Sequence, residues 1–176
     1  MISHNTLLYD LLDRKFSMDL DGENYVVNYT EGDLYELAAK LTDHQTYNLG
    51  KYPIIWLQSG YTVQRDHNKR KTKLIGCRFF FITSSELNKR YKQRYESNYN
   101  DFLYKILLKF DKVMNDRTGI NSDMIDSFRS FPLNKVSEIL GSDDHKTPLY
   151  DIWDALELST DIEITDGCFP EFIIKI

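Results

Sequence analysis

The side chains best suited to acid–base chemistry lie in the last third of the sequence. Asp151 and Asp154 flank Trp153, and two neighbouring carboxylates can act as a general acid and a general base. The same arrangement is common in a turn that caps a helix or leads into a strand. The sequence contains no GxGxxG, GxxxxGKS/T, HExxH or GxSxG segment, so the common nucleotide-binding, zinc-protease and nucleophile motifs are missing. We expect a protein that is not an enzyme, with a small enzyme that uses Asp151 and Asp154 as an alternative.

Potential metal ligands are scattered. The four histidines lie far apart in polar stretches. Asp143 and Asp144 precede His145, but no further ligand follows at the spacing that metal sites use. Residues 19–23 resemble part of a calcium loop, although Asp21 breaks its ligand spacing and a solvated turn fits better. We therefore expect no metal, no other cofactor and no small-molecule substrate.

The charged residues are strongly segregated along the chain. The 176 residues carry a formal net charge of −5, which argues against a dedicated nucleic-acid-binding protein. Residues 65–94 nevertheless hold ten Lys or Arg and two acids, a net charge of +8, whereas residues 143–166 hold eight carboxylates and one lysine. A basic stretch of this kind is often a solvated face, but it could also face phosphate or an acidic partner.

We predict that the basic stretch contacts acidic residues of a neighbouring subunit or of a stacked protein. The basic side of this predicted interface consists of residues between 65 and 73, namely Arg65, Asp66, His67, Lys69, Arg70, Lys71 and Lys73. The predicted acidic partner surface consists of Asp151, Asp154, Glu157, Asp161 and Glu163. The competing interpretation is that both stretches are solvated faces that point apart.

The first residues and the cysteines indicate a protein made in the cytoplasm. Residues 1–5 lack the basic and apolar regions of a signal peptide, and no apolar run is long enough to span a bilayer. Cys77 and Cys168 have no CxxC spacing, which favours a reducing compartment. We expect no membrane partner.

The most prominent element that the sequence predicts is a long β-hairpin over residues 52–82. Its arms, 52–57 and 74–82, are apolar and rich in β-branched and aromatic residues, whereas residues 65–71 between them are polar. Because residues 79–82 do not alternate between apolar and polar, we expect the base of the hairpin to be buried on both faces. The turn has no apolar side chain to bury, so we expect it to protrude and to contact another chain.

Three amphipathic helices are predicted around this hairpin. Residues 1–16 form an amino-terminal helix or arm, and Leu34 to Leu41 lie on a second helix with Thr30 as its N-cap. The main helix spans residues 97–115 and carries one continuous apolar stripe, formed by Phe102, Leu103, Ile106, Leu107, Phe110, Val113 and Met114. Tyr104 and Leu108 lie off this stripe, four residues apart, and are predicted to form a second contact surface.

The remaining segments predict strands and one short helix. Residues 25–29 read as a strand, and residues 124–131 as a short helix that Pro132 ends. Residues 155–176 are predicted to form the last strands, since 155–164 alternate as a half-buried strand with an acidic open face. No repeat or linker divides the chain. We therefore predict one α/β (α+β) domain over residues 1–176, with a mixed or antiparallel sheet flanked by amphipathic helices.

The order of these elements resembles the tail-completion, or tail-terminator, proteins of tailed bacteriophages. It is most similar to the neck-ring version from phages of Bacteroides-type hosts, including crAss-like phages. Three segments carry the resemblance: Tyr-Pro-Ile-Ile-Trp-Leu at 52–57, residues 79–82 leading to the helix from Phe102 to Met114, and Asp-Ile-Trp-Asp-Ala at 151–155. The resemblance covers roughly residues 51–164 and is closer in element order than in sequence.

This resemblance implies a non-enzymatic subunit of a closed ring at the head–tail connector, between portal or adaptor and tail. Its partners would be further copies of the chain and other phage neck, portal, adaptor or tail proteins, with DNA passing through the ring. Such a protein is made in the host cytoplasm and resides in the virion. The alternative is a nucleic-acid-binding accessory protein that uses the basic stretch 65–94, whose affinity for DNA would fall steeply with salt.

Overall fold

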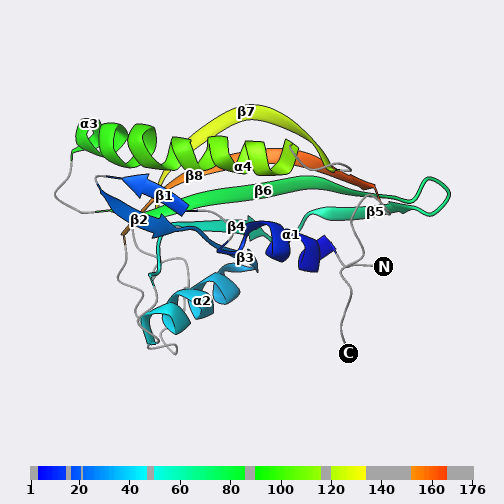
Figure 1. Cartoon of the computed structure of the whole chain (residues 1–176), viewed down its shortest axis with the longest axis horizontal. Coiled ribbons are helices and arrows are strands. Elements are labelled where there is room, and N and C mark those ends of the chain that lie inside the picture. Colours follow the sequence, from blue (N-terminus) through cyan, green and yellow to red (C-terminus); the bar gives the residue numbers. More distant parts are fainter. Residues whose placement is uncertain are drawn as a thin grey trace.

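The computed structural model describes residues 4–14, 17–20, 22–46, 50–85, 90–115, 120–133 and 152–165. They form one α+β domain, as predicted, in which helices cover a mixed sheet (Figure 1). The elements in chain order are α1 (His4–Leu12), β1 (Ser17–Leu20), β2 (Glu23–Val26), β3 (Asn28–Gly32), α2 (Leu34–Thr46), β4 (Ile54–Gln58), β5 (Thr62–Asp66), β6 (Lys71–Ser85), α3 (Tyr91–Arg94), the π-helix η1 (Tyr95–Leu103), α4 (Tyr104–Asn115), β7 (Ile120–Leu133) and β8 (Ile152–Thr165).

The main sheet has six strands in the order β3-β4-β6-β8-β7, with β5 also paired to β6. The pair β3 and β4 is parallel and the other pairs are antiparallel. Helix α2 makes the crossover between β3 and β4, because parallel neighbours cannot be joined by a tight turn. Strands β1 and β2 form a separate antiparallel pair.

The predicted hairpin over residues 52–82 is confirmed, and it is longer than predicted. Its outgoing arm is divided into β4 and β5, which pair in succession with the single long strand β6. The β5–β6 turn extends past the helices at one end of the molecule (Figure 1). Gly76, at φ 73°, lies where the pairing of β6 with β8 shifts register, which is the position of a β-bulge.

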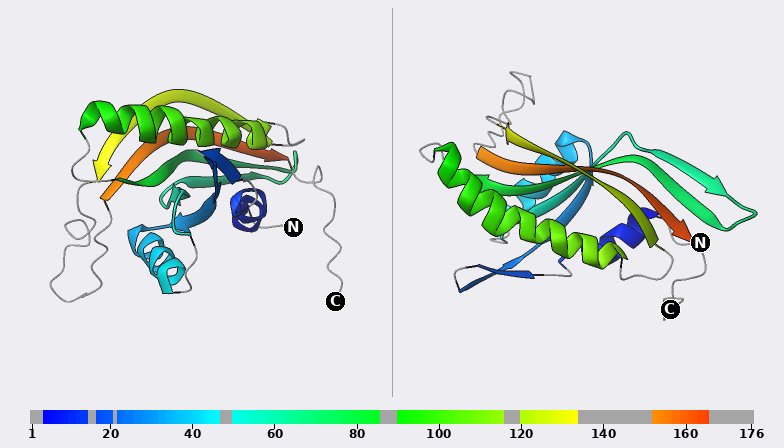
Figure 2. Two further views of the ribbon diagram at one scale, coloured as in Figure 1. Left: turned by 60° about the vertical axis from the view of Figure 1, so that its left-hand side comes forward. Right: turned by 90° about the horizontal axis from the view of Figure 1, so that it is seen from above.

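Both faces of the sheet are buried at the base of this hairpin, as predicted. Phe79 and Phe81 belong to a large apolar cluster under α1 and α4, whereas Phe80 and Ile82 belong to a second cluster under α2. The left view of Figure 2 shows the long helix on one side of the sheet and α2 on the other. Strand β6 therefore contributes core side chains to two layers at once.

The predicted main helix over 97–115 is part of a longer continuous helix made of α3, η1 and α4. Its predicted apolar stripe is confirmed, because six of its members are buried and Val113 packs against them. From Arg94 at the end of α3 through η1, the residues that face the sheet, Arg94, Tyr99 and Leu103, recur every five or four positions. A π-helix has a wider turn than an α-helix and accommodates this spacing.

Two predictions of local structure are wrong. Residues 124–131, expected as a short helix, belong to the edge strand β7, where Pro132 is tolerated because one side of an edge strand needs no backbone donors. The N-cap of α2 is Asp33 rather than Thr30, which lies in β3. Asp33 Oδ1 accepts hydrogen bonds from the N–H groups of Tyr35 and Glu36. In return, Glu36 Oε2 accepts a hydrogen bond from the Asp33 N–H, which completes a capping box.

The other predicted segments are confirmed in part. The amino-terminal helix of residues 1–16 is α1, whose four leucines are buried. The strand predicted over residues 25–29 is divided, since its first half ends β2 and its second half begins β3. The alternating strand predicted from residue 155 is β8, but its face predicted to be open is partly wrong, since Ala155 and Glu157 are buried under the α2 side of the sheet. The last strand predicted over 169–176 lies outside the described residues.

Candidate assembly surfaces

The turn between β5 and β6 carries the most exposed of the predicted site residues. Asp66 Oδ1 accepts hydrogen bonds of 3.1 Å from the backbone N–H groups of Asn68 and Lys69, which closes the turn. Arg70 adopts a left-handed backbone with φ 51°. Of the predicted site residues in and beside this turn, Arg65, His67, Lys69 and Arg70 are exposed. Lys69, which is 74% exposed, lies 3.7 Å from the Asp66 carboxylate, a contact that is worth little in water.

The cations of β6 pair with the acidic stretch of the same chain. Lys71 pairs with Glu163, and Lys73 Nζ lies 3.4 Å from Asp161 Oδ2. Further along the same two strands Arg78 Nε donates to Glu157 Oε1. Each of these pairs joins β6 to a diagonal neighbour on β8, within reach of long side chains. Within the described residues 65–78, the cations that do not pair with β8 lie in and beside the four-residue turn, where Lys69 contacts Asp66.

The predicted acidic partner surface therefore needs correction. Glu157, Asp161 and Glu163 hold cations of their own subunit, and Asp154 is buried. Asp151 lies outside the described residues. The prediction failed because charge patterns along a sequence do not reveal which strands become neighbours. Here β8 lies directly beside β6, so the two opposite charges neutralise each other inside one subunit.

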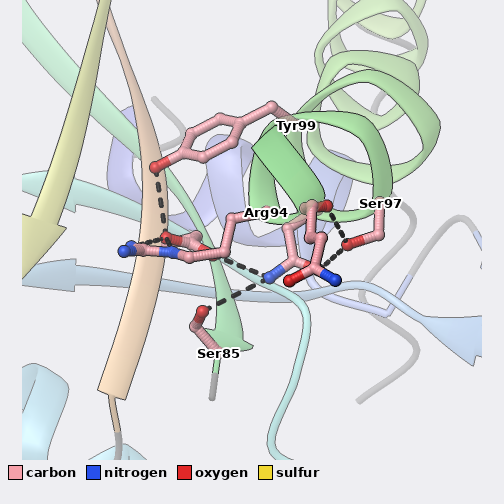
Figure 3. Close-up of polar contacts among 7 residues, drawn as sticks. Ser85, Arg94, Ser97 and Tyr99 are labelled. Atoms are coloured by element: carbon pink, nitrogen blue, oxygen red, sulfur yellow. Dashed lines mark hydrogen bonds and ion pairs between the residues drawn. The ribbon is translucent and has the colours of Figure 1, made fainter. Parts of the chain in front are cut away.

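Asp154 is the centre of a polar cluster between β8 and the long helix (Figure 3). Arg94 donates to both carboxylate oxygens, with Nε at 2.9 Å from Oδ1 and 3.2 Å from Oδ2. Asn98 Nδ2 donates at 2.7 Å, and the Tyr99 hydroxyl at 3.3 Å. The Asp154 side chain is 0% exposed and that of Arg94 is 18% exposed. This carboxylate fixes the helix to the sheet.

The electrostatics of this cluster favour the ionised carboxylate. Burial alone would raise the pKa of Asp154, but hydrogen bonds from Arg94, Ser85 and Asn98 bring it below its ordinary value. The same hydrogen bond with Asp154 raises the pKa of Arg94, in spite of its partial burial. One signal for this cluster is present in the sequence, the pair Asp151 and Asp154, and the arginine opposite could not be identified from it.

A second polar group, on the opposite face of the sheet, was not predicted. Arg78 lies over the ring of Phe80, with its guanidinium carbon 5.3 Å from the ring centre. Gln58 is the neighbour of Arg78 across β4 and β6. Among the described residues, Gln58 Oε1 and Glu157 Oε2 are buried acceptors without a protein hydrogen-bond donor. A water molecule is the simplest partner for such acceptors.

The outer face of α4 carries the second predicted contact surface. The side chains of Tyr104 and Leu108 are exposed, at 43% and 56%, while Ile106 and Phe110 on the other face are buried. The predicted division of this helix into an inner and an outer face is therefore confirmed. Whether Tyr104 and Leu108 contact another subunit stays a prediction.

Within the residues that the structure describes, no group of three His, Cys, Asp or Glu side chains is arranged to hold a metal ion. The sequence candidates Asp143, Asp144 and His145 lie outside those residues. In the described part of the chain no helix has the length and apolar character needed to cross a membrane. In comparisons with protein-family models, with curated proteins and with solved structures, none matches this chain.

Proposed function

We propose that this protein is a non-enzymatic structural subunit of a phage head–tail ring, at the neck or tail-completion position. The observation that carries the proposal is the projecting β5–β6 arm. All five residues of β5 are exposed or half-buried, and the turn beyond it carries only polar side chains. Strand β5 and the turn therefore contribute little to the core of their own subunit. It is suited to contact a neighbour in an assembly.

The resemblance in element order supports the same proposal. The hairpin that begins at Tyr52, the strand through Phe79 and the helix through Phe110 occur in the predicted order in one α+β domain. In this proposal the partners are further copies of the chain and other neck, portal, adaptor or tail proteins. The ring surrounds the path of the DNA, and the protein resides in the virion after synthesis in the host cytoplasm.

The first test is the size and shape of the purified protein. We expect mass photometry to give a multiple of the 20.8 kDa subunit mass, and negative-stain images to show closed rings with a central opening. A monomer at all concentrations would contradict the proposal.

A variant of the arm provides the matched test. Replacing residues 67–70 with Asn-Gly keeps the hairpin closed by a two-residue turn. We expect this variant to unfold at the same temperature as the wild type and to remain a monomer. The matched variant has serine at positions 67–70, which removes the charges of the turn without shortening the arm. Normal assembly of the shortened variant would show that the arm is only a surface loop.

A nucleic-acid-binding accessory protein is the second candidate, and the exposed cations of the turn favour it. Lys69 and Arg70 are exposed, and in the part of the chain that the structure describes their one acidic ion-pair partner is Asp66, beside Lys69. If duplex DNA is the partner, the logarithm of the affinity should fall linearly with the logarithm of salt concentration. Weak binding without such a slope would leave the ring subunit as the better account.

A further inference from the structure

The carboxylates of β8 pair with cations of β6 in the same subunit. An acidic surface that is open to a partner therefore has to lie in another part of the chain. Residues 16–39 contain six carboxylates and no Lys or Arg. Two of these carboxylates, Asp19 and Glu23, are exposed on the β1–β2 hairpin. Among the described residues, the side chains of this hairpin face no lysine or arginine in an ion pair.

The β1–β2 hairpin is firmly attached to the body of the subunit. Tyr25 packs edge-to-face on Phe102 of the long helix, with ring centres 5.2 Å apart. The Lys109 side chain of α4 donates to the Ser17 carbonyl oxygen. The Tyr25 hydroxyl donates to Glu23 at 2.7 Å. The described part of the hairpin is therefore held in a fixed position, as a docking surface requires.

The acidic and basic hairpins lie at opposite ends of the molecule. In Figure 1 the turn between β1 and β2 points to the left, whereas the turn between β5 and β6 forms the right-hand end. Seen from above in Figure 2, the β1–β2 hairpin also projects from the body at the end away from β5. Two different surfaces at opposite ends allow head-to-tail contacts, which close into a ring when the rotation between subunits permits.

We propose that the basic β5–β6 turn of one copy docks on the acidic β1–β2 hairpin of the next copy. Lys69 and Arg70 supply the positive charge, and Asp19 and Glu23 supply the negative charge. This inference rests on the proposed ring and specifies its subunit contact. Because exposed charge pairs are individually weak, the contact sets the register and the rate of association more than the affinity.

Reciprocal charge reversal tests this contact. The variants K69E/R70E and D19K/E23K each place like charges at the interface. Each is expected to raise the concentration of half-assembly by about tenfold or more. The combined variant K69E/R70E/D19K/E23K restores opposite charges and is expected to assemble within about threefold of the wild type. Assembly is measured by mass photometry at low salt, where surface charge acts most strongly.

A control separates the contact from the change of net charge. K92E/K105E alters net charge as much as K69E/R70E does, at exposed positions of α3 and α4. It is expected to assemble as the wild type does. If the combined variant assembles no better than K69E/R70E, or if D19K/E23K assembles normally, this contact is wrong.

Two further outcomes separate this inference from the proposed ring. If the wild type assembles but K69E/R70E/D19K/E23K does not regain assembly, the docking contact alone is overturned. If the wild type is a monomer, both the contact and the proposed ring are overturned. Binding of a short DNA duplex to K69E/R70E is measured as well. Normal assembly of this variant, together with loss of a salt-dependent DNA affinity, assigns the turn to phosphate and overturns the docking on β1–β2.

Discussion

At the scale of single residues, Asp154 joins two layers of the protein through one carboxylate. It is buried, and its donors Arg94, Asn98 and Tyr99 all come from the α3–η1 segment. A buried charge of this kind is costly unless every lone pair is satisfied. The cluster therefore determines the position of the helix more than it adds stability.

Removing one partner of this pair should be much more harmful than removing both. Arg94→Ala leaves a buried carboxylate without its cation, and we expect it to lower the free energy of unfolding by about 3–5 kcal/mol. The double variant R94M/D154L replaces both charges by apolar side chains and should recover most of that loss. Urea unfolding measures both values. Equal losses in the single and the double variant would contradict this account of the cluster.

The pH dependence of stability follows from the lowered pKa of Asp154. The folded state favours the ionised carboxylate of Asp154 more strongly than the unfolded state does. The stabilisation is therefore fully present above the unfolded pKa of about 3.9, and it is lost as the pH falls through the lower folded value. We expect the free energy of unfolding to decrease as the pH falls below about 4.

The matched variant for this titration is Asp154→Asn, which keeps the shape and removes the proton-binding group. It should start from a lower stability at neutral pH and lose less on acidification. A decrease as steep as that of the wild type would assign the acid sensitivity to other carboxylates.

At the scale of elements, the long helix has two faces with different tasks. Phe110 is fully buried and lies 5.0 Å from the Phe79 ring and 5.3 Å from the Phe81 ring, measured between ring centres. Phe110→Ala should lower the free energy of unfolding by about 3–5 kcal/mol, because it opens a cavity in this core. Tyr104→Ala, on the exposed face, should change it by only about 0.5 kcal/mol.

Chemical denaturation of both variants checks this contrast, and mass photometry then measures assembly. We expect Tyr104→Ala to weaken assembly. Leu108→Ala, one helical turn further along the same exposed face, should weaken assembly to a similar extent. Comparable loss of thermal stability in Phe110→Ala and Tyr104→Ala would mean that the faces of the helix are assigned incorrectly.

The elements that sequence periodicity predicts well are those with a single dominant pattern. The stripe of α4 was found because one face is buried and the other is not. The alternation in β8 holds only in its second half, since Ala155 and Glu157 on the face predicted to be open are buried. Strand β7 was missed because Met124, Ile125, Phe128 and Phe131 fit helical spacing, and pairing with β8 overrides that local preference. Pairing partners are long-range facts that no local pattern contains. The ion pairs between β6 and β8 were therefore assigned to different subunits.

At the scale of the whole molecule, charges inside the subunit and charges between subunits should respond differently to salt. The pairs of Lys71 and Lys73 are partly exposed, with side chains between 35% and 43% accessible. Such pairs contribute at most about 1 kcal/mol each. Raising NaCl from about 0.05 to 0.5 M should therefore change the free energy of unfolding by only about 1 kcal/mol, while shifting the assembly toward monomers.

Urea unfolding and mass photometry, performed in the same buffers, measure the two responses. Assembly that is as insensitive to salt as unfolding would show that apolar contacts, such as those of Tyr104 and Leu108, hold the subunits together. The contact proposed between the two charged hairpins would then be overturned.

The strand order has a consequence for how the protein folds during its synthesis on the ribosome. Strand β8 lies between β6 and β7, although it is synthesised after both. Until residues 152–165 leave the exit tunnel, one long edge of β6 has no partner, and β7 has no place in the sheet. Edges of this kind attract other nascent chains. A chaperone that holds the emerging chain until β8 arrives should therefore raise the yield of folded subunits, in proportion to how slowly the last strands are translated.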